Sequence, residues 1–319
     1  MPVAPRPPLH APAEPRAPHV VFDPSVKRLR PIARDDLAES GWPVVAARKE
    51  HVDEVPPCRT AVTHSYAALA FYTGGRSRVE QNGEWNLREG DVLLVPAGEP
   101  HRMLERQRPQ LWGLAFCVPC FAADAAASLL APFERVRDGG AAVVHIPLAR
   151  HEYLQGLFRE LEANSGAPRG PSDTLDAIQR SLLTLILAEV DRAETAIEPR
   201  PGHGGGVVAD ALRFIERNCL RRLTLEDVAA AIGRGPTYVT AALTQATGRS
   251  AGDWITSGRM AEARRLLLHS DERIDVVAER VGYADATHFI RMFRRAHGAT
   301  PAAWRAARTH GPRAPVPAR

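Results

Sequence analysis

Two cysteines lie three residues apart in the segment Cys117-Val-Pro-Cys120, which follows an apolar run. Cysteines at this spacing can form a redox-active pair or supply half of a zinc site. The other two of the four cysteines, Cys58 and Cys219, are distant in the sequence. Four cysteines in a chain of ordinary composition indicate a reducing cytosol rather than a disulfide framework. We therefore expect two buried thiols at the end of a strand, with a redox-responsive pair as the alternative.

A predicted helix that begins near Ala286 carries polar and basic side chains on one face. Three residues share this exposed face: Thr287, His288 and Arg291. Three apolar residues have the spacing of an inward-facing stripe: Phe289, Ile290 and Phe293. The guanidinium group of Arg291 is suited to donate two hydrogen bonds to a guanine edge, and Arg294 and Arg295 are suited to phosphates. These residues predict contact with double-stranded DNA; the alternative is a solvated helix face.

Basic residues are concentrated in the C-terminal third of the chain. Residues 207–310 contain 16 Arg against 11 Asp and Glu, a net charge of +5, whereas the whole chain carries +4. The remainder of the chain is therefore near −1. A basic segment attached to a nearly neutral body indicates a module that binds a polyanion.

The same C-terminal segment contains an internal duplication. Four residues recur 49 positions later, in the pairs Val228 and Val277, Ala229 and Ala278, Ile232 and Val281, and Gly233 and Gly282. Five more recur 50 positions later, in the pairs Val239 and Phe289, Leu243 and Phe293, Gly248 and Gly298, Ser250 and Thr300, and Trp254 and Trp304. The difference of one residue falls in a turn, where an insertion is tolerated best.

Each copy has the pattern of a helix-turn-helix unit. A short helix carries an alanine at a close contact, Ala229 or Ala278, and ends at a glycine suited to a left-handed backbone, Gly233 or Gly282. A second helix follows after a few turn residues. A single match of this kind is weak because helical hairpins are common, but two copies in register strengthen the assignment.

A helix from about Asp253 to His269 is predicted between the two copies. At ~1.5 Å per residue it is roughly 25 Å long. Successive major grooves on one face of DNA are ~34 Å apart, a comparable distance. One monomer is therefore predicted to read two adjacent grooves.

About 100 residues of this segment resemble the DNA-binding domain of the AraC/XylS family. Residues Arg259–Leu267 are similar to the connecting helix of that family, and residues Ile274–Pro301 are similar to its signature almost throughout. The resemblance implies a dual helix-turn-helix domain that regulates transcription. Activation is expected rather than repression, with RNA polymerase as the partner of an activator.

The first unit departs from the family pattern in its second helix, Pro236–Gln245. This segment has no basic residue, whereas family members usually carry Arg and Lys where this chain has Ala241 and Thr244. Three of its residues are still suited to hydrogen bonds with bases or to contact with thymine methyl groups: Thr237, Tyr238 and Thr240. The lost positive charge reduces attraction to phosphates. We expect weaker DNA contact here; the alternative is a unit that only supports the second.

Residues 41–150 follow a different pattern, in which short apolar runs alternate with turn residues. Clear runs are Ala67–Tyr72, Val92–Pro96 and Gln110–Cys117. Asn82-Gly83 between two such runs is a strong signal for a two-residue hairpin. Many short strands with close turns predict an antiparallel sandwich or barrel. The expected fold class is α+β, with an N-terminal antiparallel β-barrel and a C-terminal all-α domain.

Within this region, residues 87–101 resemble the second half of a cupin motif, which implies a cupin-like sensor barrel. An enzymatic cupin holds its metal with His-x-His, a nearby Glu and a later His. His64 and His101 fall at two of these places, but Val62 and Ala68 occupy the others. Two histidines without a carboxylate make a poor site for a catalytic metal. We expect no metal, cofactor, catalytic residue or enzyme activity; a cupin metalloenzyme with an accessory DNA-binding domain is the alternative.

A small-molecule effector in the barrel mouth is expected instead of a metal. Five residues are candidates for lining its site: His64, Tyr66, Arg78, His101 and Trp112. The competing interpretation makes His64 and His101 structural residues with satisfied hydrogen bonds.

Helical periodicity returns between the barrel and the C-terminal domain, over residues 151–196. The apolar stripe of a helix from Ser172 to Asp191 is suited to pairing with its copy in a homodimer or to packing on the barrel. Residues 197–206 are rich in Pro and Gly and predict a linker through which ligand binding moves the DNA-binding domain.

The two ends of the chain, residues 1–40 and 311–319, are predicted to be disordered arms. No apolar run approaches the ~18 residues of a membrane span, and the N-terminus does not resemble a secretory signal. We therefore expect a cytoplasmic protein with no membrane contact.

Overall fold

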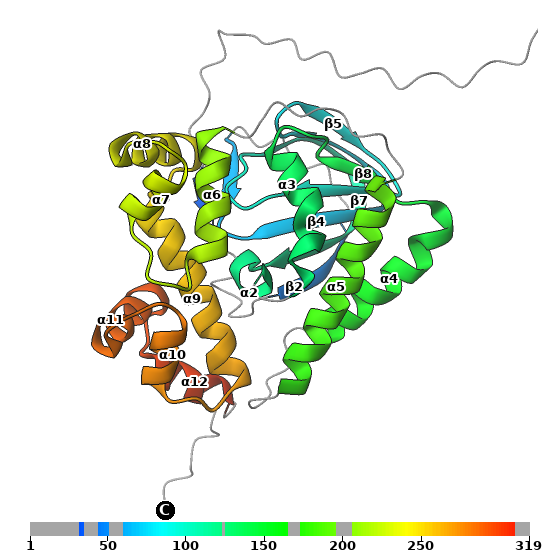
Figure 1. Ribbon diagram of the computed structural model, residues 1–319. Coiled ribbons are helices and arrows are strands. Elements are labelled where there is room, and N and C mark those ends of the chain that lie inside the picture. Colours follow the sequence, from blue (N-terminus) through cyan, green and yellow to red (C-terminus); the bar gives the residue numbers. More distant parts are fainter. Residues whose placement is uncertain are drawn as a thin grey trace, which may run out of the picture.

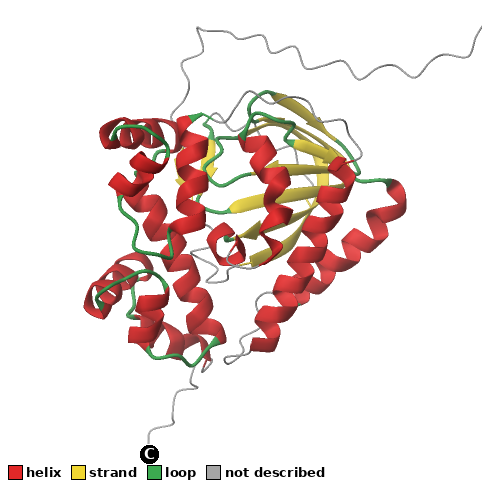
Figure 2. Cartoon of the chain, in the orientation of Figure 1, coloured by secondary structure: helices red, strands yellow, loops and turns green. Residues whose placement is uncertain are grey.

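The computed structural model describes residues 32–34, 44–50, 60–122, 125–164, 173–195 and 206–309. These residues form a β-sheet domain that helices cover on one side, and a helical C-terminal domain packed beside it (Figures 1 and 2). The predicted arms and the predicted linker lie largely or wholly outside the described residues. No helix within the described ranges is long and apolar enough to cross a membrane.

The sheet domain contains eight described strands. They are β1 (Ile32–Arg34), β2 (Val44–Glu50), β3 (Val62–His64), β4 (Ala67–Glu80), β5 (Glu84–Leu87), β6 (Asp91–Val95), β7 (Arg102–Phe116) and β8 (Val143–His145). β1 and β3 form a parallel pair, and the other six form one sheet in the order β2-β7-β4-β6-β8, with β5 paired to β4. Strands β4 and β5 meet in the hairpin predicted at Asn82-Gly83, where both residues have a positive φ.

The predicted barrel is not closed in the described residues. The hydrogen-bonded path ends at β2 on one side and at β8 on the other. One face of the sheet packs on helices instead, because Phe71 and Trp112 both stack on Phe158 of α4 (Leu148–Ala163), with centroid distances of 6.2 and 5.8 Å. The core therefore lies between a sheet and a layer of helices rather than inside a barrel.

The helices of this domain lie on one side of the open sheet. They are α2 (Val118–Ala122), the 3-10 helix η1 (Ala125–Leu130), α3 (Ala131–Arg137), α4, and α5 (Asp173–Thr195). Five apolar residues of α5 belong to the core of the domain: Leu183, Ile186, Leu187, Val190 and Ala193. Two apolar residues of the stripe predicted for this helix, Ile178 and Leu185, are exposed, so the face that packs on the sheet domain differs from the predicted one.

Seven helices form the described C-terminal domain. They are α6 (Val207–Asn218), α7 (Leu225–Ala231), α8 (Pro236–Thr247), α9 (Ala251–His269), α10 (Ile274–Arg280), α11 (Ala286–His297) and α12 (Pro301–Thr309). These helices pack around two separate apolar cores. One core contains Val239 and Leu243, and the other contains Phe289 and Phe293. The first half of α9 contributes to one core and the second half to the other. This helix therefore holds the two halves of the domain in a fixed relation.

The start of α9 is fixed by a capping box. Ser250 Oγ accepts a hydrogen bond from the Asp253 backbone N–H at 3.2 Å, and the Asp253 carboxylate accepts one from the Ser250 backbone N–H at 2.9 Å. These bonds satisfy two backbone donors that the helix itself leaves unpaired.

Replacing Ser250 with alanine should lower the free energy of unfolding by about 1 kcal/mol, because one of these donors loses its acceptor. Denaturant unfolding of the full chain measures the change, and Ser250→Thr, which keeps the hydroxyl group, is the matched control. Equal stability of the alanine variant and the wild type would show that the cap contributes nothing.

Candidate nucleic-acid interface

The duplication seen in the sequence has the same backbone geometry in both copies. Gly233 and Gly282, which follow α7 and α10, have φ values of +64° and +85°. Gly248 and Gly298, which end α8 and α11, have φ values of +77° and +73°. Side chains with a Cβ rarely adopt this region, so these positions favour glycine. The two helix-turn-helix units are therefore equivalent in structure as well as in sequence.

Helix α11, the second helix of the second unit, is capped at its N-terminus by Asp285. Its carboxylate accepts hydrogen bonds from the backbone N–H groups of Thr287 at 2.9 Å and His288 at 3.0 Å. These bonds lower the pKa of Asp285, so the carboxylate stays ionised at neutral pH. The cap fixes the end of α11 that carries the first candidate DNA contacts.

The candidate contacts on α11 lie on its exposed face. Five residues predicted to meet DNA are exposed: Thr287, His288, Arg291, Arg294 and Arg295. On the opposite face, Phe289 and Phe293 are fully buried, and Ile290 is half-buried. The structure thus brings all five side chains to one surface and leaves their guanidinium and imidazole groups accessible.

The equivalent helix of the first unit, α8, presents fewer polar groups. Thr237 and Tyr238 are exposed, the latter by 57%, and Thr240 is half-buried. Sequence reasoning noted the lack of basic residues in this helix but missed Arg234, which is exposed in the turn directly before it. The sequence feature that could have identified Arg234 is its position between two glycines, Gly233 and Gly235. Arg234 gives the first unit a positive charge beside α8.

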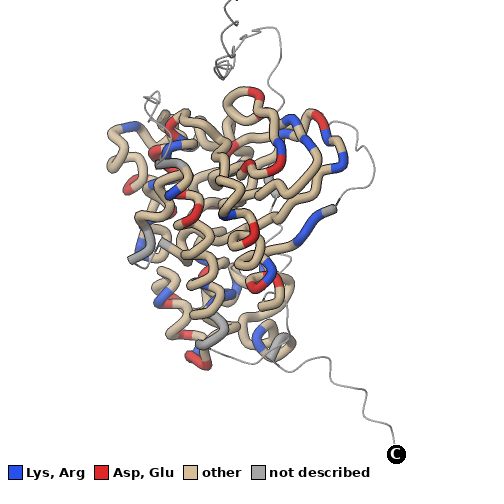
Figure 3. Tube along the Cα trace, turned by 90° about the vertical axis from the view of Figure 1, so that its right-hand side faces the viewer, with Lys and Arg blue, Asp and Glu red and all other residues tan. Residues whose placement is uncertain are grey.

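Helices α8 and α11 lie on the same side of the molecule, on the left in Figure 1, away from α4 and α5. Seen from the side of α4 and α5, Lys and Arg residues are interspersed with Asp and Glu residues (Figure 3). The arrangement leaves both candidate recognition helices open to one long, straight partner.

The C-terminal domain is docked on the sheet domain through a buried ion pair. Arg137, at the end of α3, donates two hydrogen bonds of 2.9 Å to the carboxylate of Glu216 on α6 and a third, of 3.2 Å, to the carbonyl of Ala97. The side chains of Arg137 and Glu216 are only 5% and 8% exposed. Burial raises the pKa of Glu216, and the attraction and hydrogen bonds of Arg137 oppose this rise. Each of the two buried charges is therefore stabilised in the interface by the other.

Two further contacts fix the same interface. Thr63 of β3 donates a buried hydrogen bond of 3.0 Å to the carbonyl of Thr247, the last residue of α8. Gly98 has a φ of +81°, and a Cβ placed there would lie 2.6 Å from Leu212 and 3.2 Å from Trp254. The sheet domain thus touches the helix that is expected to read DNA in the first unit. Coupling between the domains has a direct route here, besides the linker predicted from the sequence.

Glu99 lies beside this interface and has an unusual pKa. Burial raises the pKa of Glu99 to about 7, although Arg137 and a hydrogen bond from Asn82 oppose the rise. An ordinary glutamate, as in the unfolded chain, titrates near 4.5. Between these two values the folded protein keeps a proton that the unfolded chain has lost. The contribution of Glu99 to the free energy of unfolding therefore falls as the pH rises from about 4.5 to about 7, and it is constant above that range.

Glu99→Gln should remove this pH dependence and raise the stability of the protein at pH 8. Unfolding measured from pH 4.5 to 8 should show a slope that differs from the wild type by up to about one proton. Glu89→Gln, at an exposed carboxylate, is the matched control. An unchanged slope in Glu99→Gln would contradict the raised pKa.

The five candidate effector residues do not form one site. His64 and His101 lie together, with 3.2 Å between their Nε2 atoms, and the Tyr66 ring stacks on His64 at 4.6 Å. Arg78 is ion-paired with Glu84 and Glu105 near the β4–β5 hairpin. Trp112 is buried in the core against Phe158. The strand pattern placed these residues on the sheet but did not tell which face the helices cover.

The cysteine pair also differs from the expectation of two thiols. Cys117 and Cys120 are buried, as expected, but a disulfide joins them. The turn from β7 into α2 brings their Cα atoms to 5.4 Å, within the range of a disulfide. Cys219 is buried and free, and burial raises the pKa of its thiol to about 12.

The described residues contain no group of three or more His, Cys, Asp or Glu arranged to hold a metal ion.

Comparison with known proteins finds a family match in the C-terminal domain and relatives that match part of the chain. A family model described as a helix-turn-helix domain matches residues 228–307. The regulatory protein PocR of Salmonella typhimurium is 35% identical over 95 residues, which cover 30% of this chain and 31% of PocR. The transcriptional activator NphR of a Rhodococcus species is 37% identical over 94 residues, which cover 29% of this chain and 28% of NphR. This chain therefore matches about a third of each relative's length.

A solved structure is also similar to part of the chain. The DNA-binding domain of AdpA, a global transcriptional factor crystallised with a target DNA, is 31% identical, with a TM-score of 0.29. The match covers 34% of this chain and 95% of that domain. The matched family model spans the part of the structure in which the helix-turn-helix unit is duplicated. The C-terminal domain is therefore a helix-turn-helix domain similar to those of AraC/XylS-type transcriptional regulators.

Proposed function

We propose that this protein is a sequence-specific transcription regulator that places α8 and α11 in successive major grooves of one DNA duplex. The observation that carries the proposal is the duplicated unit, with both second helices exposed on the same side of α9. Helix α9 has 19 residues and is therefore about 28 Å long at ~1.5 Å per residue. This length is comparable to the ~34 Å between successive major grooves.

The two units have different roles in this proposal. The second unit reads bases through Arg291, while Arg294 and Arg295 contact phosphates. The first unit contributes hydroxyl groups from α8 and one positive charge from Arg234, which supports binding that is weaker and less salt-dependent.

The sheet domain controls the position of the first unit. Its contacts with that unit, through Arg137 and Thr63, are buried, and they reach α6 and the end of α8. A small molecule that binds the sheet domain with different affinities in its docked and released states would shift the placement of α8. The surroundings of His64 and Tyr66, beside Thr63, are the proposed place for this effector. We expect activation of transcription, as the name of NphR states for that relative.

Binding to fragments of DNA from around the protein's own gene tests this function. Wild-type protein should bind some fragments at least about 10³-fold more tightly than random DNA. Arg294→Ala should weaken binding to all fragments alike and reduce the slope of log affinity against log salt by about one. Arg159→Ala, an equal charge change on the exposed face of α4, is the matched control. Weak binding that is blind to sequence at every salt concentration contradicts the proposal.

A further inference from the structure

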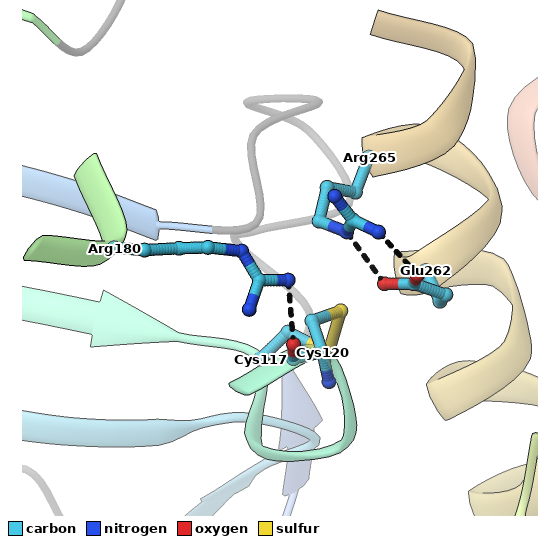
Figure 4. Close-up of a disulfide and its surroundings, with 5 residues drawn as sticks. All are labelled: Cys117, Cys120, Arg180, Glu262 and Arg265. Atoms are coloured by element: carbon cyan, nitrogen blue, oxygen red, sulfur yellow. Dashed lines mark hydrogen bonds and ion pairs between the residues drawn. A yellow bond between two sulfur atoms is a disulfide. The ribbon is translucent and has the colours of Figure 1, made fainter. Parts of the chain in front are cut away.

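The disulfide between Cys117 and Cys120 lies where the sheet domain meets α9 (Figure 4). It joins the end of β7 to α2, and both cysteines are only 4% exposed. The backbone N–H of Cys120 also donates a hydrogen bond to Cys117 Sγ at 3.3 Å. An N–H donor of this kind stabilises a thiolate when the bond is reduced, and a thiolate is the reactive form of cysteine.

Helix α2 is packed tightly against α9 at this point. Cys117 and Cys120 form a small apolar cluster with Ala261 of α9, separate from the other cores. A Cβ placed at Gly258 would lie 3.2 Å from Pro119 and 2.6 Å from Cys219 Sγ. The close approach of α2 to α9 thus depends on a glycine, and little space remains for α2 to move without displacing α9.

A second contact ties α2 to the helical layer of the sheet domain. Arg180 of α5 donates a hydrogen bond of 2.8 Å to the carbonyl of Cys120, and Figure 4 shows it on the opposite side of the disulfide from α9. The disulfide therefore lies at a junction of β7, α5 and α9. Cys117 also lines a small cavity between the domains, with Tyr66 and Gly258 among its other lining residues.

We propose that Cys117 and Cys120 form a redox-active pair whose state sets the packing of α2 against α9 and thereby the affinity for DNA. The effect on DNA rests on the proposed function. In the reducing direction, a low-molecular-weight thiol attacks the disulfide as its thiolate, and a second thiol completes the exchange. The S–S bond breaks, the pair gains two electrons and two protons, and the reductant leaves as its own disulfide. Oxidation of the pair by a disulfide reverses these steps.

Reduction must change the junction because the sulfur atoms need more room. Bonded sulfur atoms are about 2 Å apart, whereas unbonded atoms need roughly 3.5–4 Å. The sulfur atoms of Cys117 and Cys120 pack beside Ala261, so we expect their separation on reduction to loosen the contact of α2 with α9. Cys219, also in this contact, does not compete as a nucleophile, because burial raises the pKa of its thiol to about 12.

Hydrogen exchange of the full-length protein, oxidised and reduced, tests the structural part of this inference. Mixtures of oxidised and reduced glutathione set the state, and alkylation with mass spectrometry of the peptide that holds both cysteines measures it. Reduction should speed exchange at least about threefold in α2 and the first half of α9, and leave α4 unchanged. Cys120→Ser should reproduce the reduced state in both redox conditions, and Cys58→Ser is the matched control.

Two results would overturn the inference: a disulfide that is reduced only when the protein unfolds, or a reduction that leaves exchange in α2 and α9 unchanged. Both are measured on the wild type, so a poorly folded Cys120→Ser variant does not remove the test. DNA affinity should then differ at least about fivefold between the two states, and equal affinities would contradict the regulatory part. If neither state binds any DNA fragment selectively, the proposed function fails, while the exchange data still decide whether the pair is a redox site.

Discussion

Replacement of Arg137 with alanine is expected to destabilise the protein by about 3–5 kcal/mol, because it leaves the buried carboxylate of Glu216 without its partner. The variant also leaves the carbonyl of Ala97 without this donor. Arg213 lies near Glu216, but its own hydrogen bonds go to Glu134, Asp138 and Asp210. The loss should appear in denaturant unfolding of the full chain, and the first unit should separate from the sheet domain before it unfolds.

A double replacement distinguishes the pair from the packing around it. Arg137→Met combined with Glu216→Leu removes both charges at once and should recover most of the lost stability, since no buried charge remains unpaired. Arg135→Ala, which removes a more exposed arginine 3.6 Å from Asp191, is the control and should cost less than about 1 kcal/mol. If Arg137→Ala and Arg135→Ala have the same small effect, the ion pair does not hold the domains together.

The second large effect is expected on DNA, from replacement of Arg291 with alanine. If this guanidinium group reads a guanine edge, its loss should cost about 1–3 kcal/mol of binding to the preferred sequence, or roughly 5–150-fold in Kd. Binding to random DNA should change little, because phosphates supply that affinity. Competition binding with specific and random duplexes measures both quantities.

Arg291→Lys is the matched variant for this test. Lysine keeps the charge but not the planar fork that donates two parallel hydrogen bonds, so it should also lose specificity. A lysine variant that binds the preferred sequence as well as the wild type would show that Arg291 contacts a phosphate instead of a base.

The C-terminal domain was predictable because its signals are local. The turn glycines and the periodic apolar residues on each helix fix the short-range geometry, and α11 begins at Ala286, where the pattern placed it. The same glycines have positive φ values in both copies. A single match to the helix-turn-helix pattern is weak, but its repetition in register strengthened the assignment.

The sheet domain was less predictable because its decisive contacts are distant in sequence. The strands were expected to close into a barrel, but closure depends on pairing between edge strands, which an alternating pattern does not specify. Trp112 was placed at a ligand site, whereas it packs on Phe158 of a later helix. Arg137 and Glu216 are 79 residues apart and carry no local sign of pairing. The disulfide of Cys117 and Cys120 follows from the turn into α2, which the spacing alone left open.

Hydroxyl-radical footprinting on the most tightly bound DNA fragment tests the central claim most directly. If one chain places α8 and α11 in successive major grooves, the wild type should protect two stretches on the same face, with centres about 10 base pairs apart. Arg291→Ala should weaken one stretch first, and Tyr238→Ala the other. A single protected stretch, or two stretches on different faces of the duplex, would contradict the reading of two adjacent grooves by the two units.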